Sequence, residues 1–294
     1  MWGWFFLIGR VRIEGNESFF ENLGGGIVGL IAWEGLGVPI YTYGLVVFAA
    51  VVLGAACAWV TLRLAGERTA PLLDLLVYGL PVALVFARLG FVLHNASQYS
   101  SQLSEVFCVW HGGLSFYGGM LGFFLTVLGY SLVHGVSAWH WLDLLVPAFI
   151  LSIVVYELGI FGMQLTMGTP FPQDVPNDHT LMEYVEYRYR PMGFENMLYF
   201  RPIALYQAGL QLLAFVLVVL VAFVDARMGH RWRSGCRFLF GLGLVAAIRF
   251  GCGFFYLNSH PETMLPLGRL LSGGAVLLAI VLFVMRWRSR PRYF

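Results

Sequence analysis

Residues 110–122 read WHGGLSFYGGMLG, and this stretch leads into an apolar run that continues to about residue 134. Five of its residues are glycine, although glycine in a helix interior costs roughly 1 kcal/mol relative to alanine. Glycines are therefore kept where another backbone or a ligand must approach closely. Small residues four apart, as at Gly118 and Gly122, are typical of packed membrane helices. The stretch predicts a closely packed or ligand-facing site at one end of a membrane-spanning helix.

The composition is that of a membrane protein. Of 294 residues, 59% are hydrophobic and only 12% are charged, whereas about a quarter of the residues in a soluble domain are charged. All eighteen basic residues are arginine. The four cysteines lie in separate segments without a short pair spacing, which argues against a metal knuckle or a redox motif. We expect no metal, no cofactor and no nucleic-acid partner.

Seven stretches are long and apolar enough to cross a bilayer, which needs roughly 20 residues of helix. They predict an all-α integral membrane protein with seven transmembrane helices. The stretches lie near residues 38–62, 71–95, 113–134, 142–165, 203–225, 237–257 and 266–286.

Arginine predicts the orientation, because basic residues accumulate in cytoplasmic loops. Arginines follow the first stretch, link the fifth to the sixth and close the chain, so the N-terminus is expected outside and the C-terminus in the cytoplasm. The predicted organisation is an extracytoplasmic segment over 1–37, four helices over 38–165, an extracytoplasmic loop or small head over 166–202, and three helices with a basic tail over 203–294.

Three charged residues lie inside the predicted spans: Arg88, Glu157 and Arg249. At about 1.5 Å per residue, they lie roughly 25, 22 and 18 Å from the cytoplasmic starts of their helices. This places all three in the outer half of the membrane, with Tyr117 at a similar depth. Charges at such depth usually face a cavity or a partner. The pattern predicts a polar chamber open to the outer leaflet, and the alternative is a buried Arg–Glu pair that only joins helices.

Three further polar residues lie near predicted helix ends. Asp74 and Asp143 are expected in the first turns of helices that start in the cytoplasm, where a carboxylate compensates the helix dipole. His111 precedes Ser115 by four residues and could stack over it on a helix face. A solvated histidine at a junction between loop and helix is the alternative interpretation.

The glycine stretch resembles the signature GG-x-SF-H-GG of the bacterial prolipoprotein diacylglyceryl transferases. This resemblance implies a bundle of seven helices in the bacterial inner membrane, with an extracytoplasmic head and a cavity for phosphatidylglycerol. It also implies transfer of a diacylglyceryl group to a cysteine thiol, with release of glycerol phosphate. Other matching segments are YTYG at 41–44, ARLGFVL at 87–93, LYQ at 205–207 and IRF at 248–250.

The sequence departs from the family pattern at positions that carry chemistry. The signature histidine is Tyr117 here, and a phenol with a pKa near 10 is a poor base at neutral pH. An arginine of the second signature is replaced by Glu157, and an acid is replaced by Gln207. Gly253 and Tyr256 stand where the family has an acid and an arginine.

The retained residues are two arginines and the glycine scaffold. The resemblance implies that Arg88 and Arg249 bind a lipid phosphate, since a guanidinium suits a phosphate. The glycines are expected to preserve the helix packing. They are Gly112, Gly113, Gly118, Gly119 and Gly122 of the first signature, with Gly159 and Gly168 of the second.

These departures favour a catalytically degenerate family member that acts as a lipid-binding or structural subunit of a larger membrane assembly. Its expected partners are a phospholipid, such as phosphatidylglycerol, and other membrane protein subunits. The alternative is an active transferase with relocated chemistry, in which His111 or Glu157 acts as the base. The candidate catalytic residues are His111, Tyr117 and Glu157. A transporter is disfavoured, because no internal repeat or paired broken helices are evident.

Overall fold

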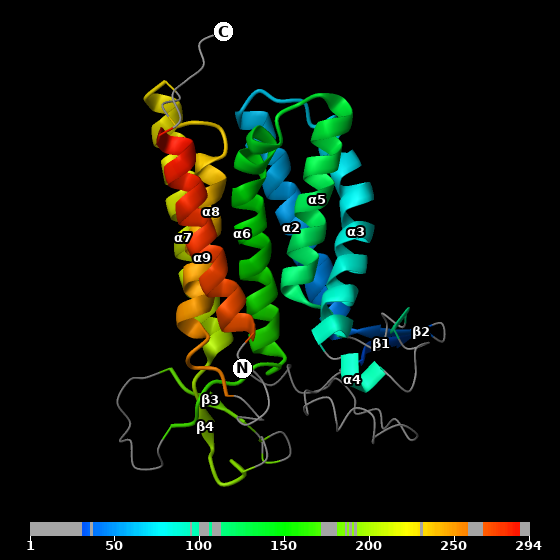
Figure 1. Cartoon of the computed structure of the whole chain (residues 1–294). Coiled ribbons are helices and arrows are strands. Elements are labelled where there is room, and N and C mark those ends of the chain that lie inside the picture. The colour runs from blue at the N-terminus through cyan, green and yellow to red at the C-terminus, as the bar shows by residue number, and fades with distance from the viewer. Residues whose placement is uncertain are drawn as a thin grey trace, which may run out of the picture.

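The computed structural model describes residues 31–35, 38–94, 96–99, 106–107, 113–171, 181–185, 187, 190, 193–229, 232–257 and 267–288. These residues form seven long helices, one short helix and two small antiparallel sheets (Figure 1). The helices are α2 (Thr42–Leu64), α3 (Ala70–His94), α4 (Ala96–Tyr99), α5 (Phe116–His134), α6 (Ala138–Gly162), α7 (Ile203–Arg227), α8 (Cys236–Cys252) and α9 (Leu267–Arg288).

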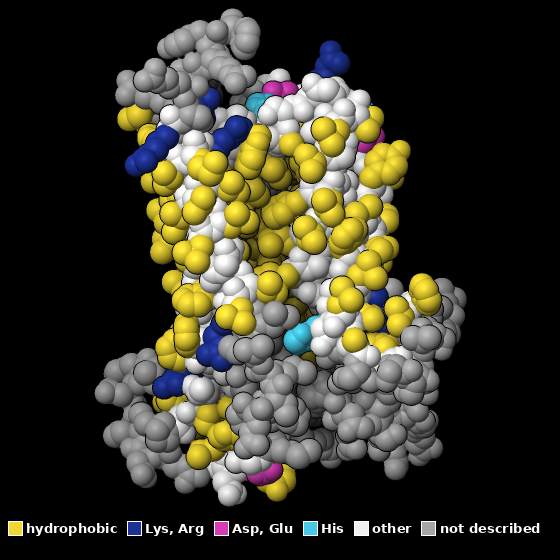
Figure 2. Space-filling view, in the orientation of Figure 1, with side chains coloured by type: hydrophobic (Ala, Val, Ile, Leu, Met, Phe, Trp, Pro, Cys, Tyr) yellow, Lys and Arg dark blue, Asp and Glu magenta, His cyan; other side chains and the backbone are white. Residues whose placement is uncertain are grey.

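Seven long helices confirm the predicted all-α membrane bundle. Six of them are long and apolar enough to cross a membrane. The seventh, α8, has 17 residues and a length of about 25 Å. It packs against α6, α7 and α9. Figure 2 shows a broad band of hydrophobic side chains across the visible face of the bundle, with basic side chains towards its two ends.

The first helix begins later than the sequence predicted. Residues Val38–Tyr41 form strand β2, which pairs with β1 (Ile31–Gly35) as an antiparallel hairpin. Pro39 explains the difference, because the residue before a proline is driven out of the helical region. Helix α2 therefore starts at Thr42, and the sixth predicted span also ends early, since α8 stops at Cys252.

Helix α6 occupies the centre of the bundle (Figure 1). It packs against α2 on one side and against α7 and α8 on the other, and it is the most buried of the apolar helices. One hydrophobic core joins Leu62, Leu75 and Val127 to α6, and a second joins it to α7 and α8 through residues such as Val218 and Leu239. The bundle therefore has two halves that share α6.

Helix α5 lies along α3 in the first half, and the glycine motif makes this contact. A β-carbon at Gly118 would collide with the carbonyl oxygen of Phe86. One at Gly122 would lie 2.9 Å from the Cα of Ala83. Ser115 caps α5, since its Oγ accepts from the backbone N–H of Gly118 at 3.3 Å. The two backbones thus meet where only glycine leaves room.

The two ends of the bundle differ in charge and in structure. The loops that join α2 to α3 and α7 to α8, with the end of α9, lie at one end, which carries Arg63, Arg68, Arg227 and Arg286 (Figure 1). By the positive-inside rule this end is cytoplasmic. The opposite end carries the β1–β2 hairpin and the pair β3 (Glu183–Tyr184) and β4 (Tyr199–Phe200). Strands β3 and β4 fall within 166–202, the predicted loop or small head.

The two aspartates do not lie in the first turns of their own helices, so that expectation was wrong. Neither α3 nor α6 has an acidic residue in its first turn. Asp143 instead caps a different helix, because its carboxylate accepts from the backbone N–H groups of Gly235 at 2.6 Å and Phe238 at 2.7 Å, at the start of α8. It thereby joins α6 to α8 at the cytoplasmic end.

Candidate functional site

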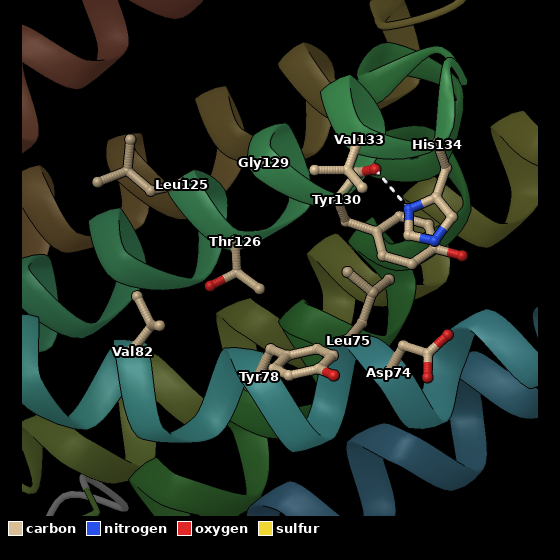
Figure 3. Close-up of a pocket in the computed structure, with 10 residues that line it drawn as sticks. All are labelled: Asp74, Leu75, Tyr78, Val82, Leu125, Thr126, Gly129, Tyr130, Val133 and His134. Atoms are coloured by element: carbon tan, nitrogen blue, oxygen red, sulfur yellow. Dashed lines mark hydrogen bonds between the residues drawn. The ribbon is translucent and has the colours of Figure 1, made fainter.

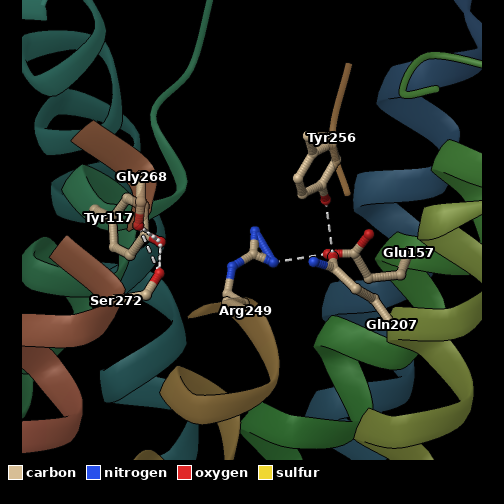
Figure 4. Close-up of polar contacts among 7 residues, drawn as sticks. All are labelled: Tyr117, Glu157, Gln207, Arg249, Tyr256, Gly268 and Ser272. Atoms are coloured by element: carbon tan, nitrogen blue, oxygen red, sulfur yellow. Dashed lines mark hydrogen bonds and ion pairs between the residues drawn. The ribbon is translucent and has the colours of Figure 1, made fainter. Parts of the chain in front are cut away.

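A largely buried arginine lies where α5, α6 and α8 meet near the extracytoplasmic end. Arg249 comes from the last turn of α8, and its Nη1 donates to Glu157 Oε1 on α6 at 2.7 Å (Figure 4). Its guanidinium carbon lies 3.9 Å from the centroid of the Phe116 ring on α5. The Glu157 side chain is only 3% exposed and that of Arg249 15%. The two opposite charges form a closely paired and nearly dry site.

Glu157 has a second polar neighbour on α7. The Tyr256 hydroxyl donates to the Gln207 amide at 3.0 Å. With the amide nitrogen turned towards Glu157, it lies 3.0 Å from Oε1, and the amide oxygen still accepts from Tyr256 at 3.1 Å. In this orientation the amide nitrogen and the amide oxygen of Gln207 both have hydrogen-bond partners. Gln207 and Arg249 therefore both donate to the same carboxylate oxygen of Glu157.

The opposite side of Arg249 faces a pair of hydroxyl groups (Figure 4). Tyr117 of α5 donates to the carbonyl oxygen of Gly268 on α9 at 3.0 Å. Its hydroxyl also lies 2.5 Å from Ser272 Oγ, which in turn bonds the same carbonyl oxygen at 2.6 Å. The guanidinium therefore sits between a carboxylate–amide group and a hydroxyl group. Five helices supply the side chains.

Arg88 on α3 occupies a separate position. Its Nε donates to the carbonyl oxygen of Val106 at 2.9 Å, and its Nη1 donates to that of Gly113 at 3.1 Å. It also lies over the rings of Phe91 and Tyr99. Arg88 is 5% exposed and holds the segment that leads into α5. Gly113 has φ of 77°, a conformation that favours glycine.

The arrangement suits an anion that enters beside Arg249. In the described part of the chain, one of the three guanidinium nitrogens has a hydrogen-bond partner, which leaves other N–H groups for a ligand. A guanidinium in a low-dielectric site binds a phosphate strongly. No cluster of three or more metal-binding side chains occurs among the described residues.

The structure brings together Tyr117, Glu157 and Arg249, which the sequence had placed at similar depth. His111 and Gly112 lie outside the described residues. Ser272 was missed, although a serine in an otherwise apolar helix was a usable signal.

A buried acid in the extracytoplasmic sheet was also missed. Glu183 on β3 is 5% exposed, and neither of its carboxylate oxygens has a hydrogen-bond partner within the described ranges. Burial raises its pKa from 4.5 to about 7, an effect that the nearby Gln164 amide opposes. Its position in sequence, among tyrosines and other acids, gave no sign of burial.

Comparison with known proteins gives consistent matches over most of the chain. Residues 31–285 match the family model described as prolipoprotein diacylglyceryl transferase. A protein of Geobacillus kaustophilus is 27% identical over 263 residues, which cover 85% of this chain and 89% of the relative. One of Listeria welshimeri is 25% identical over 261 residues, covering 86% and 88%. One of Synechocystis is 27% identical over 212 residues, covering 71% and 72%. All three relatives are named phosphatidylglycerol–prolipoprotein diacylglyceryl transferase.

Proposed function

Because the chain belongs to the prolipoprotein diacylglyceryl transferase family, we propose that it transfers the diacylglyceryl group of phosphatidylglycerol to the cysteine thiol of a prolipoprotein. The chain is a multi-pass protein of the bacterial inner membrane. Its relatives carry the name of an active enzyme, which favours this function over the expected degenerate subunit. Those relatives offer no support for a role as a structural subunit.

The placement of Arg249 is the observation that carries the proposal. The reaction breaks the bond between a glycerol carbon of the lipid and a phosphate oxygen, so negative charge grows on the departing phosphate. A buried guanidinium stabilises such charge far better than solvent does. Arg249 supplies this cation, and the hydroxyl groups of Tyr117 and Ser272 lie on the side of it opposite to Glu157. We assign the phosphate of the bound lipid to a position in contact with the Arg249 guanidinium.

We assign to Glu157 the role of the base that accepts the proton of the acceptor thiol. The Arg249–Glu157 pair carries no net charge, since one cation pairs with one carboxylate. A lipid phosphate that approaches Arg249 competes with Glu157 for the guanidinium, which leaves the carboxylate free to accept a proton. When the thiol gives up its proton, the sulfur attacks the glycerol carbon and glycerol phosphate leaves. Protonation of Glu157 removes a negative charge from beside the phosphate just as that phosphate becomes more negative.

Tyr117 and Arg88 are assigned positioning roles. The Tyr117 hydroxyl is engaged with Ser272 and Gly268, so it orients the phosphate side of the site instead of acting as a base. Arg88 is committed to two carbonyl oxygens at the entrance to α5. In this role Arg88 fixes the position of Phe116 and Tyr117, and it affects phosphate binding indirectly without contacting the phosphate.

The test is turnover by the detergent-purified protein with phosphatidylglycerol and a peptide that carries the acceptor cysteine. Release of glycerol phosphate is measured beside an active relative. We expect turnover by the unmodified chain. Arg249→Gln should reduce kcat by about 10²-fold or more, as loss of a donor to a developing oxyanion does. Arg63→Gln, which removes an exposed cytoplasmic arginine, is the matched control and should retain full activity.

The outcomes separate the function from the assignment of its residues. No turnover by the unmodified chain, with the relative active, overturns the transferase and supports the degenerate lipid-binding subunit. The Glu157–Arg249 pair is the feature that favours this second function, because it can serve packing alone. Turnover that persists in Glu157→Gln within a few fold would retain the function and remove Glu157 as the base.

A further inference from the structure

A cleft of about 450 Å³ opens between α3 and α5 at the cytoplasmic end of the bundle (Figure 3). This is the end opposite to the Arg249 site. Its deep part is apolar and includes Val82 and Leu125. The positions of Asp74 and Val82 on one helix imply a length of about 12 Å along the membrane normal. The cleft is therefore an elongated slot that runs from the cytoplasmic surface into the hydrocarbon region.

The mouth of the cleft is polar and acidic. Asp74 and Tyr78 of α3 face Tyr130 and His134 of α5 across it (Figure 3). Tyr130 and His134 are stacked, with ring centroids 4.0 Å apart, and His134 Nδ1 lies 2.9 Å from the Tyr130 carbonyl oxygen. Asp74 is exposed and makes no ion pair with an arginine in the described part of the chain. The mouth thus presents one carboxylate and two phenol rings.

We propose that this cleft binds an amine-bearing phospholipid of the cytoplasmic leaflet, with its ammonium group on Asp74 and one acyl chain in the apolar slot. Charge complementarity identifies the ligand. The rest of this end is rich in arginine and suits anionic headgroups, but no arginine lines the cleft. A carboxylate flanked by the rings of Tyr78 and Tyr130 attracts an ammonium group through both charge and cation–π contact. An anionic headgroup such as phosphatidylglycerol is repelled by the same carboxylate.

The middle of the slot is kept open by Gly129. A β-carbon at this position would meet no other atom within 4 Å, so the glycine is not required for helix packing. This contrasts with Gly118 and Gly122, which are in tight contact with α3. A larger side chain at Gly129 would occupy the space assigned to the acyl chain while leaving the fold intact.

The test is a competition between two lipids. The full chain in detergent is mixed with equimolar phosphatidylethanolamine and phosphatidylglycerol, and native mass spectrometry measures how much of each lipid it retains. Asp74→Asn should lower phosphatidylethanolamine retention about three- to fivefold, the size expected from an exposed charge pair. Gly129→Leu should lower it at least as much. Gly209→Leu is the matched control, because Gly209 on α7 is exposed and also has open space around it.

The measurement separates a built site from general lipid contact. Preferential retention of phosphatidylethanolamine that both cleft variants lose and Gly209→Leu keeps would support the proposal. Equal retention of the two lipids by the unmodified chain would overturn it, as would unchanged retention in Asp74→Asn. Asp74 lies on the surface, so this variant answers the question even if Gly129→Leu fails to fold. Transferase activity is not needed for any of these readouts.

Discussion

Removal of the Arg249 charge should destabilise the bundle through the carboxylate that it leaves behind. At the observed 2.7 Å separation, the attraction between Arg249 and Glu157 is about 6 kcal/mol for an effective dielectric constant of about 20. Much of this attraction offsets the desolvation of the two charges. The loss from breaking such a pair on one side is about 3–5 kcal/mol. We therefore expect Arg249→Met to lower the free energy of unfolding by this amount.

The assay is a double-mutant cycle with Arg249→Met, Glu157→Gln and the double variant, measured by reversible unfolding in mixed micelles. The double variant leaves no charge at the Arg249–Glu157 site, so it should be more stable than Arg249→Met alone. Arg249→Met and the double variant both lose the contact between Arg249 and Phe116, so this loss cancels in the cycle. The coupling energy should be about 2 kcal/mol or more.

Two results would refute this reasoning. A coupling energy below about 0.5 kcal/mol would mean that the two charges do not depend on each other. A loss below about 1 kcal/mol for Arg249→Met would mean that water reaches Glu157 and screens it. Either result would also remove the basis for a neutral, dry site.

Three further predictions concern other parts of the molecule. The pKa of Glu183 is about 7 in the folded chain and about 4.5 in the unfolded chain. The free energy of unfolding should therefore fall by up to about 3 kcal/mol as pH rises through this interval. Thermal unfolding of Glu183→Gln should lack this pH dependence. Gly118→Ala should destabilise the chain by about 1–3 kcal/mol through collision with α3, whereas Gly209→Ala should stabilise it by up to about 1 kcal/mol, as chemical denaturation would reveal. Asp143→Asn weakens two charge-assisted hydrogen bonds to the start of α8 and should cost about 1–3 kcal/mol in the same assay; no change would mean that α8 is held without this cap.

The sequence was sufficient for the membrane architecture, because a helix that crosses a bilayer must satisfy its own backbone and carry about 20 apolar residues. It placed all seven helices to within a few residues. The error at Val38–Tyr41 arose because hydropathy alone does not separate a strand from the start of an apolar helix. The proline at residue 39 was the local signal that decided it.

The depth of a charge could also be read from the sequence, since depth follows from the rise per residue. The sequence could not show which charged residues are in contact, because contact depends on how each helix is rotated and on which helices are neighbours. The sequence grouped Arg88 and Arg249 as two phosphate ligands, and it gave no sign that the Arg88 guanidinium donates to the carbonyl oxygens of Val106 and Gly113.

By itself, then, the sequence determined the membrane class, the number and direction of the helices and the glycine face on α5. Each of these follows from composition or from spacing along a single helix. The tertiary structure alone decided that Glu157 pairs with Arg249, that Tyr117 meets Ser272, and that Asp143 caps a helix 92 residues away in the chain. These contacts join different helices, and their geometry is set by packing across the whole bundle.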